Sequence, residues 1–251
     1  MSSPALSRNA KFQPAQTVNE LNNLYNQPAA GVNVMTMENT LQKTVISFAL
    51  LLVTAAVGWF IPVIAFPAAI IALVLGLVNA FRKEPNVGLI LAYAAFEGLF
   101  IGGISSFFET IFPGVVIQAV LASLVVVGVT LALFASGKVR ATPKLTKFFI
   151  IATISYIGFS LINFGLMVTG VTNTMFGARD TLVFGVPLGI IIGIFAVLLA
   201  TYSLIMDFTF IQNGINNRVE ARYGWTAAFG LMVTIVWLYV EILRILAISR
   251  N

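Results

Sequence analysis

The stretch that decides the fold is residues 185–250, GVPLGIIIGIFAVLLATYSLIMDFTFIQNGINNRVEARYGWTAAFGLMVTIVWLYVEILRILAISR. It contains two long apolar runs joined by a polar link at residues 213–222. Each run is long enough for a helix that crosses a bilayer, which needs roughly 20 apolar residues. Each run also carries an acidic residue, Asp207 in the first and Glu241 in the second. A carboxylate at membrane depth is costly, so these two residues indicate a partner or a function.

Composition places the whole chain in a membrane. The chain has 251 residues, of which 59% are hydrophobic and 9% charged, whereas soluble domains have about 45–50% and about 25%. It has no Cys and no His, which excludes disulfides, thiolate metal sites and the usual catalytic triads. We therefore expect no enzyme, no cofactor and no fixed metal site. The net charge of +5 is explained by basic loops of a membrane protein rather than by nucleic-acid binding.

Hydropathy predicts an all-α integral membrane protein with seven transmembrane helices. The apolar runs lack strict alternation, which favours helices over barrel strands. We expect residues 1–40 to form a polar, disordered cytoplasmic tail and residues 41–251 to form the transmembrane domain. The tail lacks the apolar core of a signal peptide. The seven predicted spans are residues 45–61, 63–81, 87–108, 115–135, 148–168, 182–210 and 225–248.

The distribution of basic residues predicts the orientation. Eleven of the 14 Lys and Arg residues fall in the tail and in the second, fourth and sixth links, and three (Arg179, Arg244 and Arg250) fall on the other side. Basic residues concentrate on the cytoplasmic side. We therefore expect the N-terminus inside and the C-terminus outside.

Small residues recur at helical spacing and predict close helix contacts. Gly98 and Gly102 do so in the third span, and Gly185, Gly189 and Gly193 do so in the sixth. Asp207 lies on the same face as the sixth-span glycines, so its side chain should point into the bundle near the inner end of that span.

Polar residues at membrane depth are the candidate functional residues. Glu97 lies near the midplane, one turn after Tyr93, and we expect it to be neutral or cation-bound at neutral pH. Glu241 lies nearer the outer end, where Arg244 could pair with it on the same helix, so a structural pair and a transport role both remain open. Asn163 ends a polar stripe on the fifth span that also suits helix packing (Thr153, Tyr156, Ser160 and Asn163).

By depth, Asp207, Glu97 and Glu241 could form a ladder of oxygen ligands for a cation. Calcium prefers carboxylate and carbonyl oxygens, and rings of Asp and Glu select cations in channels. Hydration of Asp207 by lipid headgroups is the alternative. Positions along one sequence do not show that the three side chains share a pore.

Several segments resemble the Bax inhibitor-1 family, particularly its actinobacterial branch. The resemblance covers about residues 35–250 and is carried by TMENTLQKT at 36–44, AYAAFEGLFIGGIS at 92–105, ATPKLTKFF at 141–149, SLIMDFTFIQNGI at 203–215 and LYVEILRIL at 238–246. It implies a seven-helix bundle with the last helix at the centre. It also implies a pH-sensitive calcium leak channel of the bacterial inner membrane, latched by two facing aspartates on the sixth and seventh helices.

The resemblance assigns roles to particular positions. Asp207 matches the first aspartate, Arg244 matches an arginine near the end of the last helix, and the second aspartate falls on Thr234, which cannot ionise. The family's second-helix glutamate falls near Ile71, while this chain has Glu97 in the third helix instead. The two-aspartate latch is therefore not intact in this chain.

Three functions are compatible with this sequence. The first is a passive pathway for calcium or other cations, gated by protonation of intramembrane carboxylates. The second is a non-conducting regulator that binds another membrane protein, such as a membrane-anchored protease. The third is a transporter for a small metabolite.

Overall fold

The computed structural model describes residues 33–251, so most of the predicted tail lies outside the described residues. In this part of the chain seven helices are long and apolar enough to cross a membrane. The predicted all-α fold is confirmed. The seven helices are α3 (Met37–Phe60), α4 (Ala65–Phe81, preceded by the short helix η2, Pro62–Ile64), α5 (Val87–Ile111), α6 (Val115–Ala135), α7 (Pro143–Val168), α8 (Leu188–Asn216) and α9 (Gly224–Ile248).

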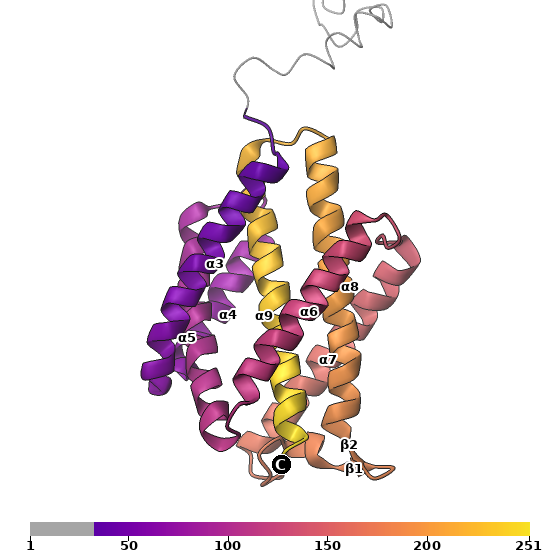
Figure 1. Cartoon of the computed structure of the whole chain (residues 1–251). Helices are drawn as coiled ribbons and strands as arrows, with labels where there is room; N and C mark the ends of the chain where they lie inside the picture. The colour runs from indigo at the N-terminus through magenta and orange to yellow at the C-terminus, as the bar shows by residue number, and fades with distance from the viewer. Residues whose placement is uncertain (1–32) are drawn as a thin grey trace, which may run out of the picture. The chain divides into compact units, whose positions relative to one another are not determined.

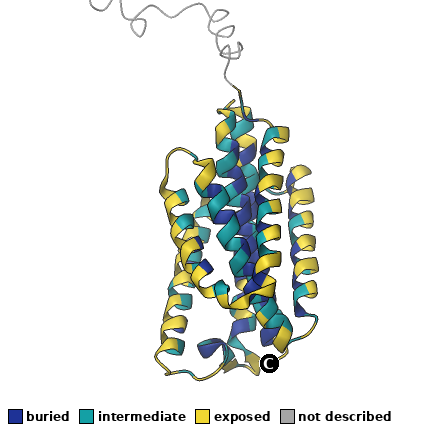
Figure 2. Cartoon of the chain, turned by 90° about the vertical axis from the view of Figure 1, so that its left-hand side faces the viewer, coloured by how far each residue is buried: buried dark blue, intermediate teal, exposed yellow. Residues whose placement is uncertain are grey.

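Helix α9 is the centre of the bundle (Figure 1). It packs against α3, α5, α6 and α8, and 61% of its most apolar window is buried, a larger share than in any other of the seven helices. Buried residues gather along the middle of the bundle, whereas the peripheral helices are exposed on their outer faces (Figure 2). Many of the exposed residues on these helices are large and hydrophobic. In water such faces would be a large aggregation-prone surface, so they are the surface that contacts lipid.

Glycines allow the helix backbones to approach closely, as predicted for Gly98, Gly102, Gly189 and Gly193. A Cβ atom on Gly102 would lie 1.9 Å from the Ala55 carbonyl oxygen of α3, and one on Gly98 would also collide with α3. Gly189 and Gly193 face Ile248 and Ile245 of α9, respectively. These contacts fix α5 against α3 and α8 against α9.

The helix starts differ from the predicted spans because capping residues extend the helices beyond the apolar runs. Helix α3 begins at Met37, where Thr36 and Asn39 form a capping box. Residues 37–40 therefore belong to the first helix and not to the tail. Helix α7 begins at Pro143 after the cap residue Thr142, earlier than the predicted Phe148.

The sixth span is displaced towards the C-terminus relative to the prediction. Residues 182–187 form a β-hairpin, β1 (Leu182–Val183) and β2 (Val186–Pro187), and α8 starts at Leu188. Phe184 and Gly185 both have positive φ, as the two central residues of a type I′ hairpin turn do. Gly185 is therefore a turn residue, and its predicted role in helix packing was wrong. Because α8 continues to Asn216, Asp207 lies about 14 Å from the helix end at 1.5 Å per residue, deeper than predicted.

A short helix in the α7–α8 connection also packs into the bundle. This helix is η3 (Gly177–Asp180), and it contacts both α7 and α8. Phe176, just before it, is buried and stacks on Phe108 of α5 with ring centroids 6.1 Å apart. The connection thus covers the end of the bundle that also holds the C-terminus (Figure 1).

Candidate functional site

Asp207 and Thr234 face each other across the contact between α8 and α9. The Thr234 hydroxyl donates a hydrogen bond of 2.7 Å to Asp207 Oδ2, and it lies 3.1 Å from the Ser203 hydroxyl. Asp207 Oδ1 lies close to Gly230, where an added Cβ would be 3.1 Å away. The small-residue face of α8 brings the helices this close, and the carboxylate points into the bundle as predicted.

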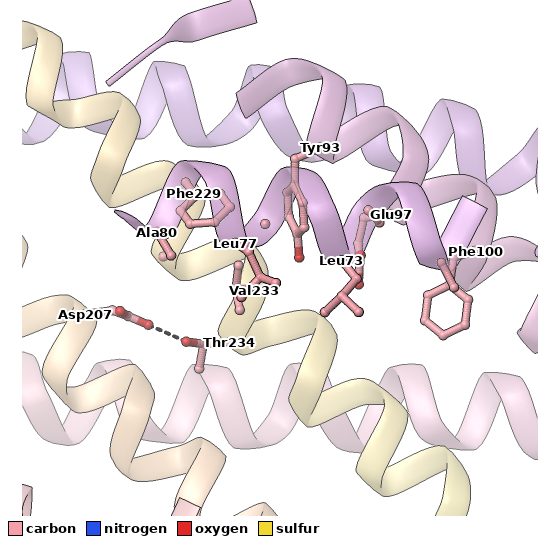
Figure 3. A pocket seen from close by; sticks show the side chains of 14 residues that line it. Leu73, Leu77, Ala80, Tyr93, Glu97, Phe100, Asp207, Phe229, Val233 and Thr234 are labelled. Atoms are coloured by element: carbon pink, nitrogen blue, oxygen red, sulfur yellow. Dashed lines mark hydrogen bonds between the residues drawn. The ribbon is translucent and has the colours of Figure 1, made fainter. Parts of the chain in front are cut away.

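A cavity of about 600 Å³ lies beside this pair, between α4, α5, α8 and α9. Asp207, Thr234, Glu97 and Tyr93 line it, and Figure 3 shows the two carboxylates on separate helices at different places around the cavity. Tyr93 lies one turn before Glu97 and interacts with its carboxyl group. Glu97 is ten residues into α5 and Thr234 is ten residues into α9. Both side chains are therefore near mid-height in their helices.

None of the 14 lining residues is a Lys or an Arg. Of the two basic residues nearest to Asp207 in sequence, Arg222 pairs with Glu84 at 3.1 Å and with Glu220 at 2.6 Å. The Asp207 carboxylate instead accepts its hydrogen bond from the neutral Thr234. The cavity therefore concentrates negative charge when its carboxyl groups are ionised.

Glu241 lies in a second polar cluster, further along α9 towards the C-terminus. Its side chain is buried, and Arg244 Nη1 donates to both carboxylate oxygens at 2.9 and 3.1 Å. Tyr156 of α7 and Trp237 also donate hydrogen bonds to Glu241. The Glu241–Arg244 pair, one of the two roles that the sequence left open, is thus present, and Glu241 does not line the cavity.

Arg179 belongs to the same cluster, although the sequence placed it in an outer loop. It is only 3% exposed, and its Nη2 donates to Ser160 at 2.9 Å and to Tyr156 at 3.3 Å. Its guanidinium carbon lies over the rings of Tyr156 and Phe159, at 5.5 and 5.3 Å from their centroids. Within the described residues its Nη1 has no hydrogen-bond partner.

The polar stripe on α7 is the surface that holds this loop in place. Tyr156 and Ser160 bind Arg179. Asn163 donates to the Phe176 carbonyl at 3.2 Å and accepts from the Ala178 amide at 2.7 Å. These residues attach η3 to the bundle, which is the packing role expected of the stripe. The stripe was the one sequence signal that could have revealed a buried partner such as Arg179.

The three acidic residues therefore occupy two separate places. Asp207 and Glu97 share one cavity, whereas Glu241 lies about 10 Å beyond Thr234 along α9, at seven residues and 1.5 Å per residue. Across residues 33–251 there is no group of three or more His, Cys, Asp or Glu side chains that could hold a metal ion.

Comparison with known proteins agrees with this architecture. The family model described as Bax inhibitor 1 like matches residues 3–251. The chain belongs to the Bax inhibitor 1 like family. This match includes the N-terminal residues that the sequence resemblance had left outside. A search of curated proteins finds no match. The protein is thus a multi-pass membrane protein of the Bax inhibitor 1 like family, with the last helix packed against four of the others.

Proposed function

We propose that the protein is a proton-gated leak pathway for cations, calcium foremost, in the bacterial inner membrane. The observation that carries this proposal is the cavity near mid-height, which both Asp207 and Glu97 line and which has no Lys or Arg among its lining residues. Acidic groups inside a membrane protein attract cations and lower the barrier to their passage. The basic links at the end where α3 begins support a cytoplasmic N-terminus.

Asp207 is the proton sensor in this proposal. When ionised, it is a strong acceptor for Thr234 and holds α8 against α9. Protonation removes this charge and weakens the contact between the two helices. The other ionisable groups that line the cavity are Glu97 and Tyr93 of α5. Glu97 is therefore the second group that can respond to protons or hold a cation.

In the same proposal, the Glu241 cluster blocks the cation pathway at its outer end. Its hydrogen-bonded charges are two guanidinium groups, Arg179 and Arg244, and one carboxylate, Glu241. The excess positive charge opposes the passage of a cation. Trp237 lies between Thr234 and Glu241 on α9, and its ring packs against Tyr156 while its indole N–H donates to Glu241. A cation can leave on that side only when η3 or α9 moves.

Calcium uptake into liposomes that contain only the purified protein tests the proposal. We expect uptake above that of protein-free liposomes, and we expect the double variant Glu97→Gln/Asp207→Asn to have an altered rate. Glu38→Gln is the matched control because Glu38 is exposed at the start of α3, outside the cavity. Equal uptake by wild-type and protein-free liposomes would contradict the proposal.

A second candidate is a non-conducting regulator that binds a transmembrane helix of another protein. A groove of about 820 Å³ between α3, α5, α6 and α9 favours it, because exposed apolar residues such as Leu52 and Leu124 line this groove. A helix of a partner could pack into it. A regulator of this kind would give no calcium uptake in liposomes, and bulky substitutions at Leu52 would disrupt the complex.

A further inference from the structure

The acidic cavity has walls that differ from those of a metal-ion site. Of its 14 lining residues, only Tyr93, Glu97, Asp207 and Thr234 have polar side chains, and the other ten are apolar or glycine. Calcium takes six to eight oxygen ligands at 2.3–2.6 Å. Here the oxygens lie at separate places around the cavity (Figure 3). A metal ion in the cavity has to keep much of its water, against walls that offer water few hydrogen bonds.

A lipophilic organic cation fits the same walls better, because its alkyl or aromatic groups do not need to keep water around them. Tyr93 and Phe229 pack edge to face with centroids 5.0 Å apart, and Phe100 lines the cavity on the same side as Glu97. Aromatic faces attract organic cations. The volume of about 600 Å³ is within the range of small-molecule sites, which are mainly apolar with a few polar groups that set specificity.

The rim of the cavity is open to the lipid-facing side of the bundle. Leu73 and Leu77 of α4 both line the cavity and are 64% and 51% exposed, and Val233 of α9 is 37% exposed. A molecule that reaches the cavity from this side comes through hydrocarbon. Access from the bilayer selects for a cation whose charge is covered by alkyl or aromatic groups.

We propose that this cavity binds lipophilic organic cations, such as quaternary ammonium or phosphonium compounds, taken up from the bilayer. The positive centre lies between the carboxylates of Glu97 and Asp207, and the apolar groups contact Phe229, Phe100 and the α4 wall. Binding uses the same cavity as the proposed cation pathway, but it does not depend on conduction. An occupied cavity would exclude calcium, so such cations would inhibit any leak.

Equilibrium dialysis of the full chain in lipid nanodiscs tests the inference, with tetraphenylphosphonium as the probe and empty nanodiscs as the blank. We expect saturable binding of one cation per chain. Tetraphenylborate has the same shape and the opposite charge, and it should show no saturable binding. Glu97→Gln and Asp207→Asn should each weaken binding by at least about tenfold, because each removes one attractive charge in a poorly screened site. Glu38→Gln should leave binding unchanged.

A substitution that only fills space distinguishes binding inside the cavity from a general attraction of cations to negative charge. Ala69 lines the cavity and Ala132 is exposed on α6 away from it. Ala69→Leu keeps both carboxylates and should weaken binding by filling the space, whereas Ala132→Leu should not. The inference is overturned if both tetraphenyl ions bind equally, if the Gln and Asn variants bind like wild type, or if no saturable binding occurs. Binding without calcium uptake would contradict the proposed function and leave this inference standing, and uptake without binding would do the reverse.

Discussion

Replacing Asp207 by Asn tests the sensor directly, because Asn has the shape of the protonated side chain and cannot ionise. A hydrogen bond to a charged group contributes about 1.5–3 kcal/mol and one between neutral groups about 0.5–1.5 kcal/mol. The Thr234–Asp207 contact of 2.7 Å should therefore lose about 1–1.5 kcal/mol in the variant. At about 1.4 kcal/mol per factor of ten, the open state becomes about five- to twelvefold more populated at pH 8.

The assay is calcium uptake into liposomes as a function of pH. Asp207→Asn should conduct at pH 8 at this higher rate and lose most of its pH dependence. Thr234→Val is the matched comparison, since it removes the donor but keeps the carboxylate. It should also raise uptake at pH 8 and lose most of the pH dependence, because protonation of Asp207 then has no hydrogen bond from residue 234 left to weaken. If Asp207→Asn has the wild-type pH profile, Asp207 is not the sensor, and the group must be sought at Glu97 or Glu241.

Four further predictions concern other parts of the molecule. Glu97→Gln should fold normally but change the uptake rate, and an unchanged rate in a well-folded variant would make Glu97 a structural residue. Thr234→Asp places a second carboxylate opposite the first and should shift the opening pH, whereas an unaltered profile would show that the two positions are not coupled. Arg244→Gln leaves Glu241 buried without its ion partner and should destabilise the protein by about 3 kcal/mol. This is the lower end of the usual range, because the Arg244 side chain is 26% exposed. Thermal unfolding of the purified protein measures the effect, and a melting temperature equal to that of the wild type would contradict it. A reporter fused after Asn251 should face outside and one in the α6–α7 link should face the cytoplasm, and the same side for both would refute the orientation.

The number and order of the helices could be predicted because hydropathy alone identifies membrane spans. Their ends could not, because the decisive features are local. Thr142 and Thr36 start helices outside the apolar runs. The turn at Phe184 and Gly185 converts an apolar stretch into a hairpin. Apolar composition does not distinguish a hairpin at the membrane edge from the first turn of a helix.

The candidate site was predicted in part. The helical spacing of the small residues along α8 correctly predicted that the Asp207 side chain points into the bundle, and the family resemblance placed Thr234 opposite it. The depth of each residue in the membrane, estimated from its position in the sequence, suggested one ladder of three carboxylates. Which side chains share a cavity depends on how the helices pack, and Glu241 belongs to a different cluster. The sequence placed Arg179 only by side, in the connection between the fifth and sixth spans, and gave no sign that it is buried. Its burial requires the partners on α7, which only the folded chain brings next to it.

The most direct test of a proton-gated cation pathway is the calcium uptake of the wild-type protein alone in liposomes, compared at pH 8 and pH 6. Protonation of Asp207 weakens its contact with Thr234, so we expect uptake above that of protein-free liposomes that increases from pH 8 to pH 6. Uptake that equals the protein-free rate at both pH values would contradict a cation pathway. Uptake that is present but independent of pH would contradict gating by the intramembrane carboxylates.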